Sequence, residues 1–100
     1  MVMIFANENA RTQLLKHGVV VTFRVKKHKE GKDWATDRRC GKKIANINVA
    51  YLEIVEGVIP LARNVELSGF LHVWDWVEAI KSFHKLNLVR GYLYKVELRP

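Results

Sequence analysis

A β-strand is predicted by the run Val19-Val20-Val21-Thr22-Phe23-Arg24-Val25, which consists mainly of β-branched and aromatic residues. Side chains alternate between the two faces of a strand, so Thr22 and Arg24 share one face while Val21 and Phe23 share the other. Two placements of Thr22 and Arg24 are open at this point. They line a pocket if the strand belongs to a barrel, and they form an outward polar edge if it does not.

The segments on either side of this run have different characters. Asn7 or Asn9 can cap a helix start and Gly18 can cap a helix end, which predicts a helix near residues 8–17. Residues 26–43 lose apolar periodicity, which predicts one long loop or irregular ribbon. A strand follows over residues 44–55, and its alternation slips at Tyr51 and Leu52, which predicts a β-bulge or a sharp bend.

The rest of the chain completes an α+β pattern. Residues 56–71 contain Pro60 and are predicted to cross between elements without forming a central strand. A helix from about His72 to His84 is predicted by the apolar positions Val73, Trp76, Val77, Ile80 and Phe83. Alternation of Tyr92, Tyr94, Val96 and Leu98 predicts a final strand, in which we expect the tyrosines to pack and not to act as ligand contacts. Residues 1–100 are therefore expected to form a single α+β domain.

The composition excludes several protein classes. Apolar residues make up 49% of the chain and charged residues 27%, as in a globular protein. Cys40 is the only cysteine, so we expect no internal disulfide, no multi-cysteine metal site and a cytoplasmic setting. The histidines lack the spacing of metal ligands, and no cofactor is expected. No apolar run is long enough to cross a bilayer, so no membrane association is predicted.

Positive charge is concentrated in one part of the sequence. The net charge of +7 at pH 7 attracts polyanions. Residues 24–43 contain nine basic and three acidic residues, a balance of +6, and the other eighty residues carry +1. Arginine forks match phosphate geometry, lysines act as point charges, and an exposed indole offers a stacking surface for an unpaired base. The predicted nucleic-acid contacts are Thr22, Arg24, Lys26, Lys27, Lys29, Lys32, Trp34, Arg38, Arg39, Lys42 and Lys43.

Several short motifs occur in a characteristic order along the chain. They are Leu14-Leu15-Lys16-His17-Gly18, Val21-Thr22-Phe23-Arg24, Gly41-Lys42-Lys43-Ile44-Ala45, Ser68-Gly69-Phe70, Trp74-Asp75-Trp76-Val77-Glu78-Ala79-Ile80 and Gly91-Tyr92-Leu93-Tyr94-Lys95-Val96-Glu97-Leu98. In this order the chain resembles the ASCH family, whose members have a small β-barrel related to the PUA RNA-binding domain. The resemblance implies a PUA-like barrel with two main flanking helices and favours RNA binding.

One hydrolytic branch of that family acts on acetylated cytidine with a lysine and a glutamate. Aligning on Thr22 and on Gly69-Phe70 puts Val19 and Ser68 at those two positions, and neither side chain can replace the missing group. Thr22 and Arg24 are the parts of the pattern that match.

The leading hypothesis is a nucleic-acid-binding module, with RNA favoured over DNA, that uses residues 24–43 and a cleft near Thr22 and Arg24. One alternative is a nuclease or modified-nucleoside hydrolase in which Glu66, His72 or Lys16 replaces the missing catalytic groups. Another alternative is a protein-interaction domain for an acidic partner. The catalytic residues and the oligomeric state are not predicted.

Overall fold

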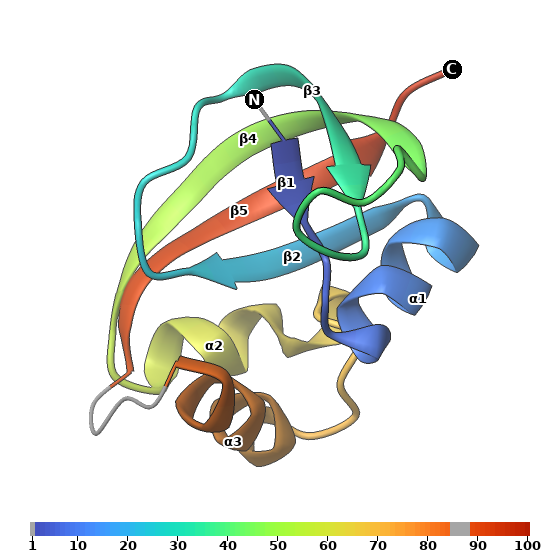
Figure 1. Cartoon of the computed structure of the whole chain (residues 1–100). Helices are drawn as coiled ribbons and strands as arrows, with labels where there is room; N and C mark the ends of the chain where they lie inside the picture. The colour runs from blue at the N-terminus through green and yellow to red at the C-terminus, as the bar shows by residue number, and fades with distance from the viewer. Residues whose placement is uncertain (1, 85–88) are drawn as a thin grey trace.

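The computed structural model describes residues 2–84 and 89–100 of the 100-residue chain. Its strands and helices are mixed along the sequence, which confirms the predicted α+β class (Figure 1). In chain order the elements are β1 (Val2–Ile4), α1 (Glu8–His17), β2 (Val19–Arg24), β3 (Gly31–Thr36), β4 (Ala45–Glu56), α2 (Ile59–Asn64), a 3-10 turn (Val65–Leu67), α3 (Val73–His84) and β5 (Arg90–Leu98).

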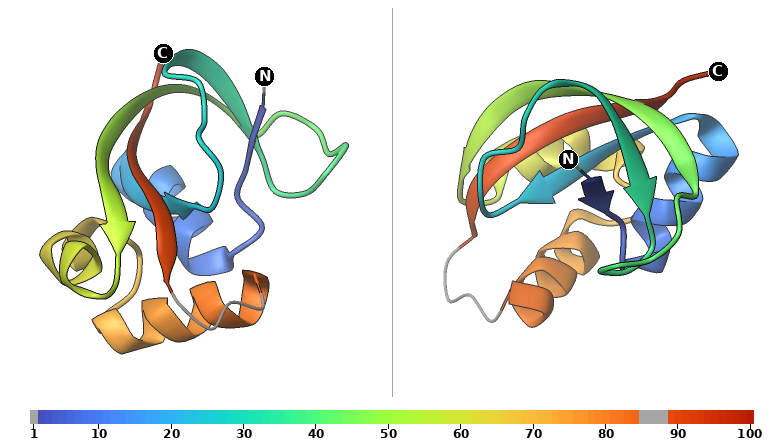
Figure 2. Two further views of the ribbon diagram at one scale, coloured as in Figure 1. Left: turned by 90° about the vertical axis from the view of Figure 1, so that its left-hand side faces the viewer. Right: turned by 45° about the horizontal axis from the view of Figure 1, so that its top comes forward.

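The described strands form one curled, mixed sheet. Their order across the sheet is β1-β3-β4-β5-β2, in which β1 pairs parallel with β3 and the other neighbours pair antiparallel. The sheet bends into a half-barrel whose two edges are β1 and β2 (Figures 1 and 2). Three α-helices accompany it within the described residues, against the two main helices that we predicted.

The predicted irregularity in the second long strand is present. The pairing of β4 with β5 shifts register between Tyr51 and Glu53, so Leu52 is the extra residue. A bulge of this kind bends a strand and increases its twist. The twelve-residue β4 can therefore curve around the half-barrel, as Figure 1 shows.

Helix α1 has the bounds predicted from its caps. Asn7 Oδ1 accepts a hydrogen bond from Ala10 N at 3.2 Å at the start of the helix. Gly18 adopts a φ of 78° at the end, where its N–H bonds Leu14 O. A left-handed φ of this kind suits glycine. The buried Ala10 and Leu14 fix the helix against the sheet.

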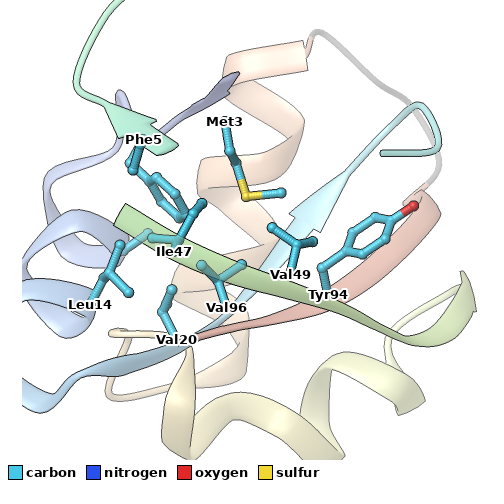
Figure 3. Close-up of a cluster of buried hydrophobic side chains, with 10 residues drawn as sticks. Met3, Phe5, Leu14, Val20, Ile47, Val49, Tyr94 and Val96 are labelled. Carbon is cyan, nitrogen blue, oxygen red and sulfur yellow. The ribbon is translucent and has the colours of Figure 1, made fainter. Parts of the chain in front are cut away.

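Two hydrophobic clusters hold the fold together. The interior of the half-barrel receives side chains from every described strand and from α1, and Figure 3 shows eight of them converging there. Its members are Met3, Phe5, Ala10, Leu14, Val20, Ala35, Ile47, Val49, Tyr94 and Val96.

The second cluster lies on the other face of β2 and β5, where α2 and α3 pack. Trp76, one of the apolar positions from which α3 was predicted, is 4% exposed in this cluster, whereas Trp74 is 64% exposed. Both faces of β2 are therefore buried. Among the described residues we find no helix with the length and apolar character needed to cross a bilayer.

One sequence expectation is wrong and another is incomplete. Residues 26–43 do not form one loop, because Gly31–Thr36 is strand β3 between β1 and β4. Residues 56–71 are not a plain crossing segment, because they contain α2, which has Pro60 in its first turn, and the 3-10 turn. Pro60 is compatible with a helix start, since a first-turn residue needs no intrahelical N–H bond.

Candidate functional site

A pocket opens between the two edges of the half-barrel, and we call it the Arg24 pocket. Residues 4–7 line one side, residues 22–24 of β2 line another, and Phe70 and α3 supply the remaining wall. Its volume is about 100 Å³. The lining is mostly apolar, with side chains that include Phe5, Phe23, Phe70, Trp76, Ile80 and Phe83, and its polar members are Asn7, Thr22 and Arg24.

The register of β2 sets the direction of Thr22 and Arg24. Thr22 lies opposite Tyr94 on β5, and Arg24 lies opposite Tyr92. Directly paired residues share one face of a sheet, and Tyr94 belongs to the half-barrel interior. Thr22 and Arg24 therefore point inward. They line a pocket and do not form an outward polar edge.

The Arg24 side chain is held away from water without full hydrogen bonding. Its guanidinium carbon lies 5.0 Å from the centroid of the Phe5 ring. Nε is buried and has no hydrogen-bond partner among the described residues. Burial lowers the pKa of Arg24 to about 10, so the group remains a cation at neutral pH. A buried donor without a partner is unfavourable, and an acceptor oxygen of a ligand in the pocket would satisfy it.

Neither Ser68 nor the three residues considered as replacements for the missing catalytic groups line this pocket. Ser68 is 1% exposed, and its Oγ donates to Val65 O at 2.6 Å and accepts from Phe70 N at 3.0 Å, so it stabilises a turn. Glu66 and His72 are exposed outside the lining, and Lys16 lines a different surface hollow beside α1. Within the described residues the lining carries no carboxylate, imidazole or amine.

A basic loop, defined here as residues 37–43, starts beside the pocket. Phe5 N donates to Thr36 O at 2.7 Å, which ties the pocket wall to the start of this loop. Thr36 Oγ1 donates to Lys42 O at 2.9 Å, and Gly41 N donates to Arg38 O at 2.9 Å. The loop is therefore folded back on itself, and Figure 2 shows it projecting from the sheet. Its exposed cations are Arg38, Arg39, Lys42 and Lys43.

The other predicted basic contacts lie elsewhere. Lys26, Lys27 and Lys29 are exposed on the connection between β2 and β3, and Lys32 is exposed at the start of β3. The six residues of β3 separate this connection from the basic loop by roughly 17–20 Å. The structure thus divides the charge of residues 24–43 between the pocket and the two ends of β3, which corrects the expectation of one continuous basic loop.

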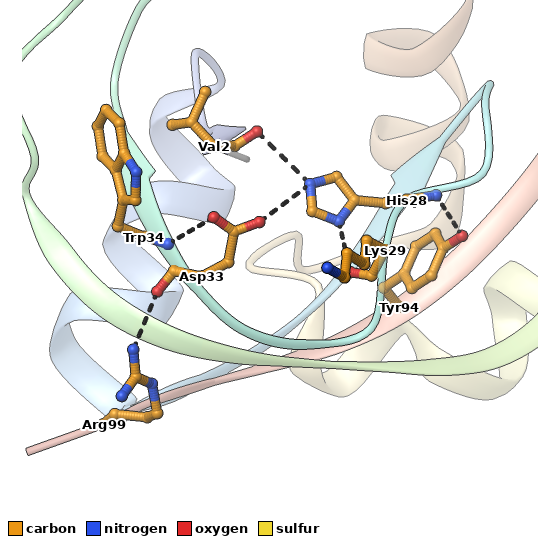
Figure 4. Close-up of polar contacts among 7 residues, drawn as sticks. All are labelled: Val2, His28, Lys29, Asp33, Trp34, Tyr94 and Arg99. Carbon is orange, nitrogen blue, oxygen red and sulfur yellow. Dashed lines mark hydrogen bonds and ion pairs between the residues drawn. The ribbon is translucent and has the colours of Figure 1, made fainter.

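His28 and Trp34 are not the freely exposed rings that stacking would favour. His28 Nδ1 contacts Lys29 O at 2.8 Å, and its Nε2 lies 3.6 Å from Asp33 Oδ2 and 3.5 Å from Val2 O (Figure 4). The His28 side chain is only 11% exposed, and it ties the connection between β2 and β3 to both β1 and β3. Trp34 is half-buried on β3, so its indole is less accessible to a stacking base than the sequence predicted.

Sequence reasoning missed the aromatic walls of the Arg24 pocket. Phe5 directly follows β1, a strand too short to be predicted, and Phe70 follows the 3-10 turn. Both residues are apolar and lie close to predicted helices, which was the available signal, but their separation in the sequence does not indicate that they meet. No family model matches this sequence, and no curated protein or solved structure is significantly similar to it.

Proposed function

We propose that this protein is a nucleic-acid-binding module of the ASCH type with a PUA-like half-barrel, and that it binds single-stranded RNA. The observation that carries the proposal is the Arg24 side chain in the pocket, whose buried Nε has no hydrogen-bond partner among the described residues. Such a group is stabilised when a ligand supplies an acceptor. The exposed cations of the adjoining basic loop would contact neighbouring phosphates.

The size of the pocket limits which part of a nucleotide enters it. Its volume of about 100 Å³ is below that of the roughly 150 Å³ apolar cavity that takes benzene. A whole nucleoside does not fit inside, whereas a phosphate or one edge of an unpaired base does. Arg24 would donate to the phosphate oxygens or to base acceptors, and the Thr22 hydroxyl lies two residues away on the same face.

A single strand suits this arrangement better than a duplex. Sequence-specific RNA recognition usually reads unpaired bases through arginine and aromatic side chains, because the major groove of duplex RNA is too narrow for side chains. The walls of the Arg24 pocket supply aromatic rings, and the guanidinium supplies donors. A cytoplasmic location remains a prediction from the single cysteine.

Titration at several salt concentrations tests the proposal. Labelled single-stranded RNA, duplex RNA and single-stranded DNA are compared on the wild-type protein and on a variant with Arg38, Arg39, Lys42 and Lys43 changed to glutamate. Each lost phosphate contact lowers the salt slope by about 0.7 for a single strand, so the variant should lose up to about 3 in slope and bind more weakly. Affinity that is indifferent to salt would contradict the proposal.

The same samples separate the alternative functions. Turnover of RNA or of acetylated cytidine would indicate an enzyme, whereas retention of an acidic protein without any oligonucleotide binding would indicate a protein-interaction domain. The proposal expects oligonucleotide binding without turnover.

A further inference from the structure

A second hollow, which we call the tyrosine groove, lies beside the bulge of β4. Its volume is about 370 Å³, and the residues that matter for its chemistry are Lys27, His28, Glu30, Tyr51, Tyr92 and Tyr94. It combines three aromatic rings with a lysine, and the Arg24 pocket and the basic loop contribute none of these residues.

The groove is preformed, because the connection between β2 and β3 is fixed over the sheet at two points. His28 N donates to Tyr94 Oη at 2.7 Å, and Tyr51 N donates to Glu30 Oε1 at 2.8 Å. The second bond occupies one carboxylate oxygen of Glu30 at the bulged position of β4. A ligand that enters the groove therefore meets side chains already in place, which lowers the entropy that binding must overcome.

Tyr51 offers an accessible ring within this frame. It is 43% exposed, and its ring centroid lies 6.4 Å from that of Tyr92 and 5.7 Å from that of Tyr94, with tilted or edge contacts in both pairs. Lys27 Nζ lies 5.8 Å from the centroid of the Tyr92 ring. An exposed aromatic ring next to a cation is the combination that single-stranded nucleic acids use, because bases stack and phosphates attract the charge.

The groove adjoins the Arg24 pocket on the same face of the sheet. Tyr92, which lines the groove, lies on β5 directly opposite Arg24 of the pocket on β2. The two sites are therefore neighbours. The exposed Lys26 and Lys29 lie on the same β2–β3 connection as Lys27. The positive charge at this end of β3 therefore has an aromatic site of its own, about 17–20 Å along β3 from the basic loop.

We propose that the tyrosine groove is a second nucleotide subsite, in which an unpaired base stacks on Tyr51 while the adjacent phosphate approaches Lys27. This inference rests on the proposed binding of a single strand at the Arg24 pocket. At the duplex rise of about 3.4 Å per nucleotide, five to six nucleotides span the length of β3, and an unstacked strand needs fewer. Oligonucleotides of eight nucleotides should therefore reach the basic loop and the tyrosine groove together, whereas trinucleotides are too short to span them.

The test measures affinities for single-stranded RNAs of three and eight nucleotides. Tyr51→Leu keeps an apolar side chain and removes the ring, Tyr51→Phe restores the ring, and Leu52→Ala alters an exposed neighbour outside the groove. Stacking on one ring corresponds to about 5- to 140-fold in affinity, so Tyr51→Leu should weaken binding of the eight-nucleotide RNA by a factor in that range. Tyr51→Phe and Leu52→Ala should bind it within about twofold of wild type.

Lys27→Gln provides a second measurement if Tyr51→Leu does not fold. It should lower the salt slope for the eight-nucleotide RNA by about 0.7, because one phosphate contact is lost. Equal affinity and slope of wild type, Tyr51→Leu and Lys27→Gln for the long RNA would overturn the subsite while leaving the proposed function in place. A wild-type protein that binds no oligonucleotide would instead refute the proposed function.

Discussion

Replacing Arg24 by methionine should stabilise the free protein while weakening its binding of RNA. Burial lowers the pKa of Arg24 to about 10, well below that of a free arginine, and one pKa unit corresponds to about 1.4 kcal/mol, so the burial of this charge costs about 3 kcal/mol. The contact with the Phe5 ring at 5.0 Å returns about 0.5–2 kcal/mol of this. Methionine fills similar space without a charge and should raise the free energy of unfolding by about 1–3 kcal/mol.

The pH dependence of this effect has a defined sign. The folded-state pKa of Arg24 lies below its unfolded-state pKa, so the unfolded chain binds this proton more tightly. The destabilisation is therefore fully present below about pH 10 and is lost as the pH rises from there toward the unfolded-state pKa. The difference in stability between Arg24→Met and wild type should be constant near neutral pH.

Urea and thermal unfolding measure the expected gain. For a domain of this length, each kcal/mol corresponds to about 4–8 °C in Tm. Arg39→Met is the matched control, because it removes an exposed cation of the basic loop and the same unit of net charge, and it should change stability by at most about 0.5 kcal/mol. A less stable Arg24→Met protein would show that the guanidinium is well satisfied in the free molecule and would refute the reasoning from its burial.

Three further substitutions test the frame around the site. Gly41→Ala places a Cβ 2.5 Å from Thr36 Oγ1 and 2.9 Å from Arg38 O, so the basic loop must shift, and we expect a loss of about 1–3 kcal/mol in urea unfolding together with weaker RNA binding. Asn7→Ala removes the side-chain cap of α1 and should cost about 1 kcal/mol, whereas Asn9→Ala should be near neutral; equal effects would contradict the assignment of the cap. Leu14→Ala in the core should lower the free energy of unfolding by about 2–5 kcal/mol, and its neighbour Leu15→Ala, 47% exposed, should lie within about 0.5 kcal/mol of wild type by the same assay.

Elements with strong local signals were predictable from the sequence. Asn7 and Gly18 define both ends of α1, the apolar spacing around Trp76 identifies α3, and the slip at Tyr51 locates the bulge. Strand β3 was missed because its stability comes from pairing with β4 and β1, residues distant in sequence, and not from its own propensity. Strand β1 has only three residues, which is too few for a periodic signal.

The candidate site was predictable only in part. Alternation places Thr22 and Arg24 on one face of β2, but only the pairing with β5 shows that this face is the inside of the half-barrel. The division of the basic residues between the two ends of β3 depends on that unpredicted strand. The Phe5 wall of the pocket depends on the bond from Phe5 N to Thr36 O, which joins segments that sequence patterns treat separately.

The lining of the Arg24 pocket comes from three parts of the chain, residues 4–10, 22–24 and 70–83. No fragment that lacks one of these parts contains the complete pocket, so a ligand held there recognises only the fully folded domain. Binding of such a ligand must then raise the melting temperature of the protein, and at ligand concentrations above Kd the rise grows with the logarithm of the ligand concentration. Thermal-shift screening of nucleotides and short oligomers is therefore a direct way to find the natural ligand.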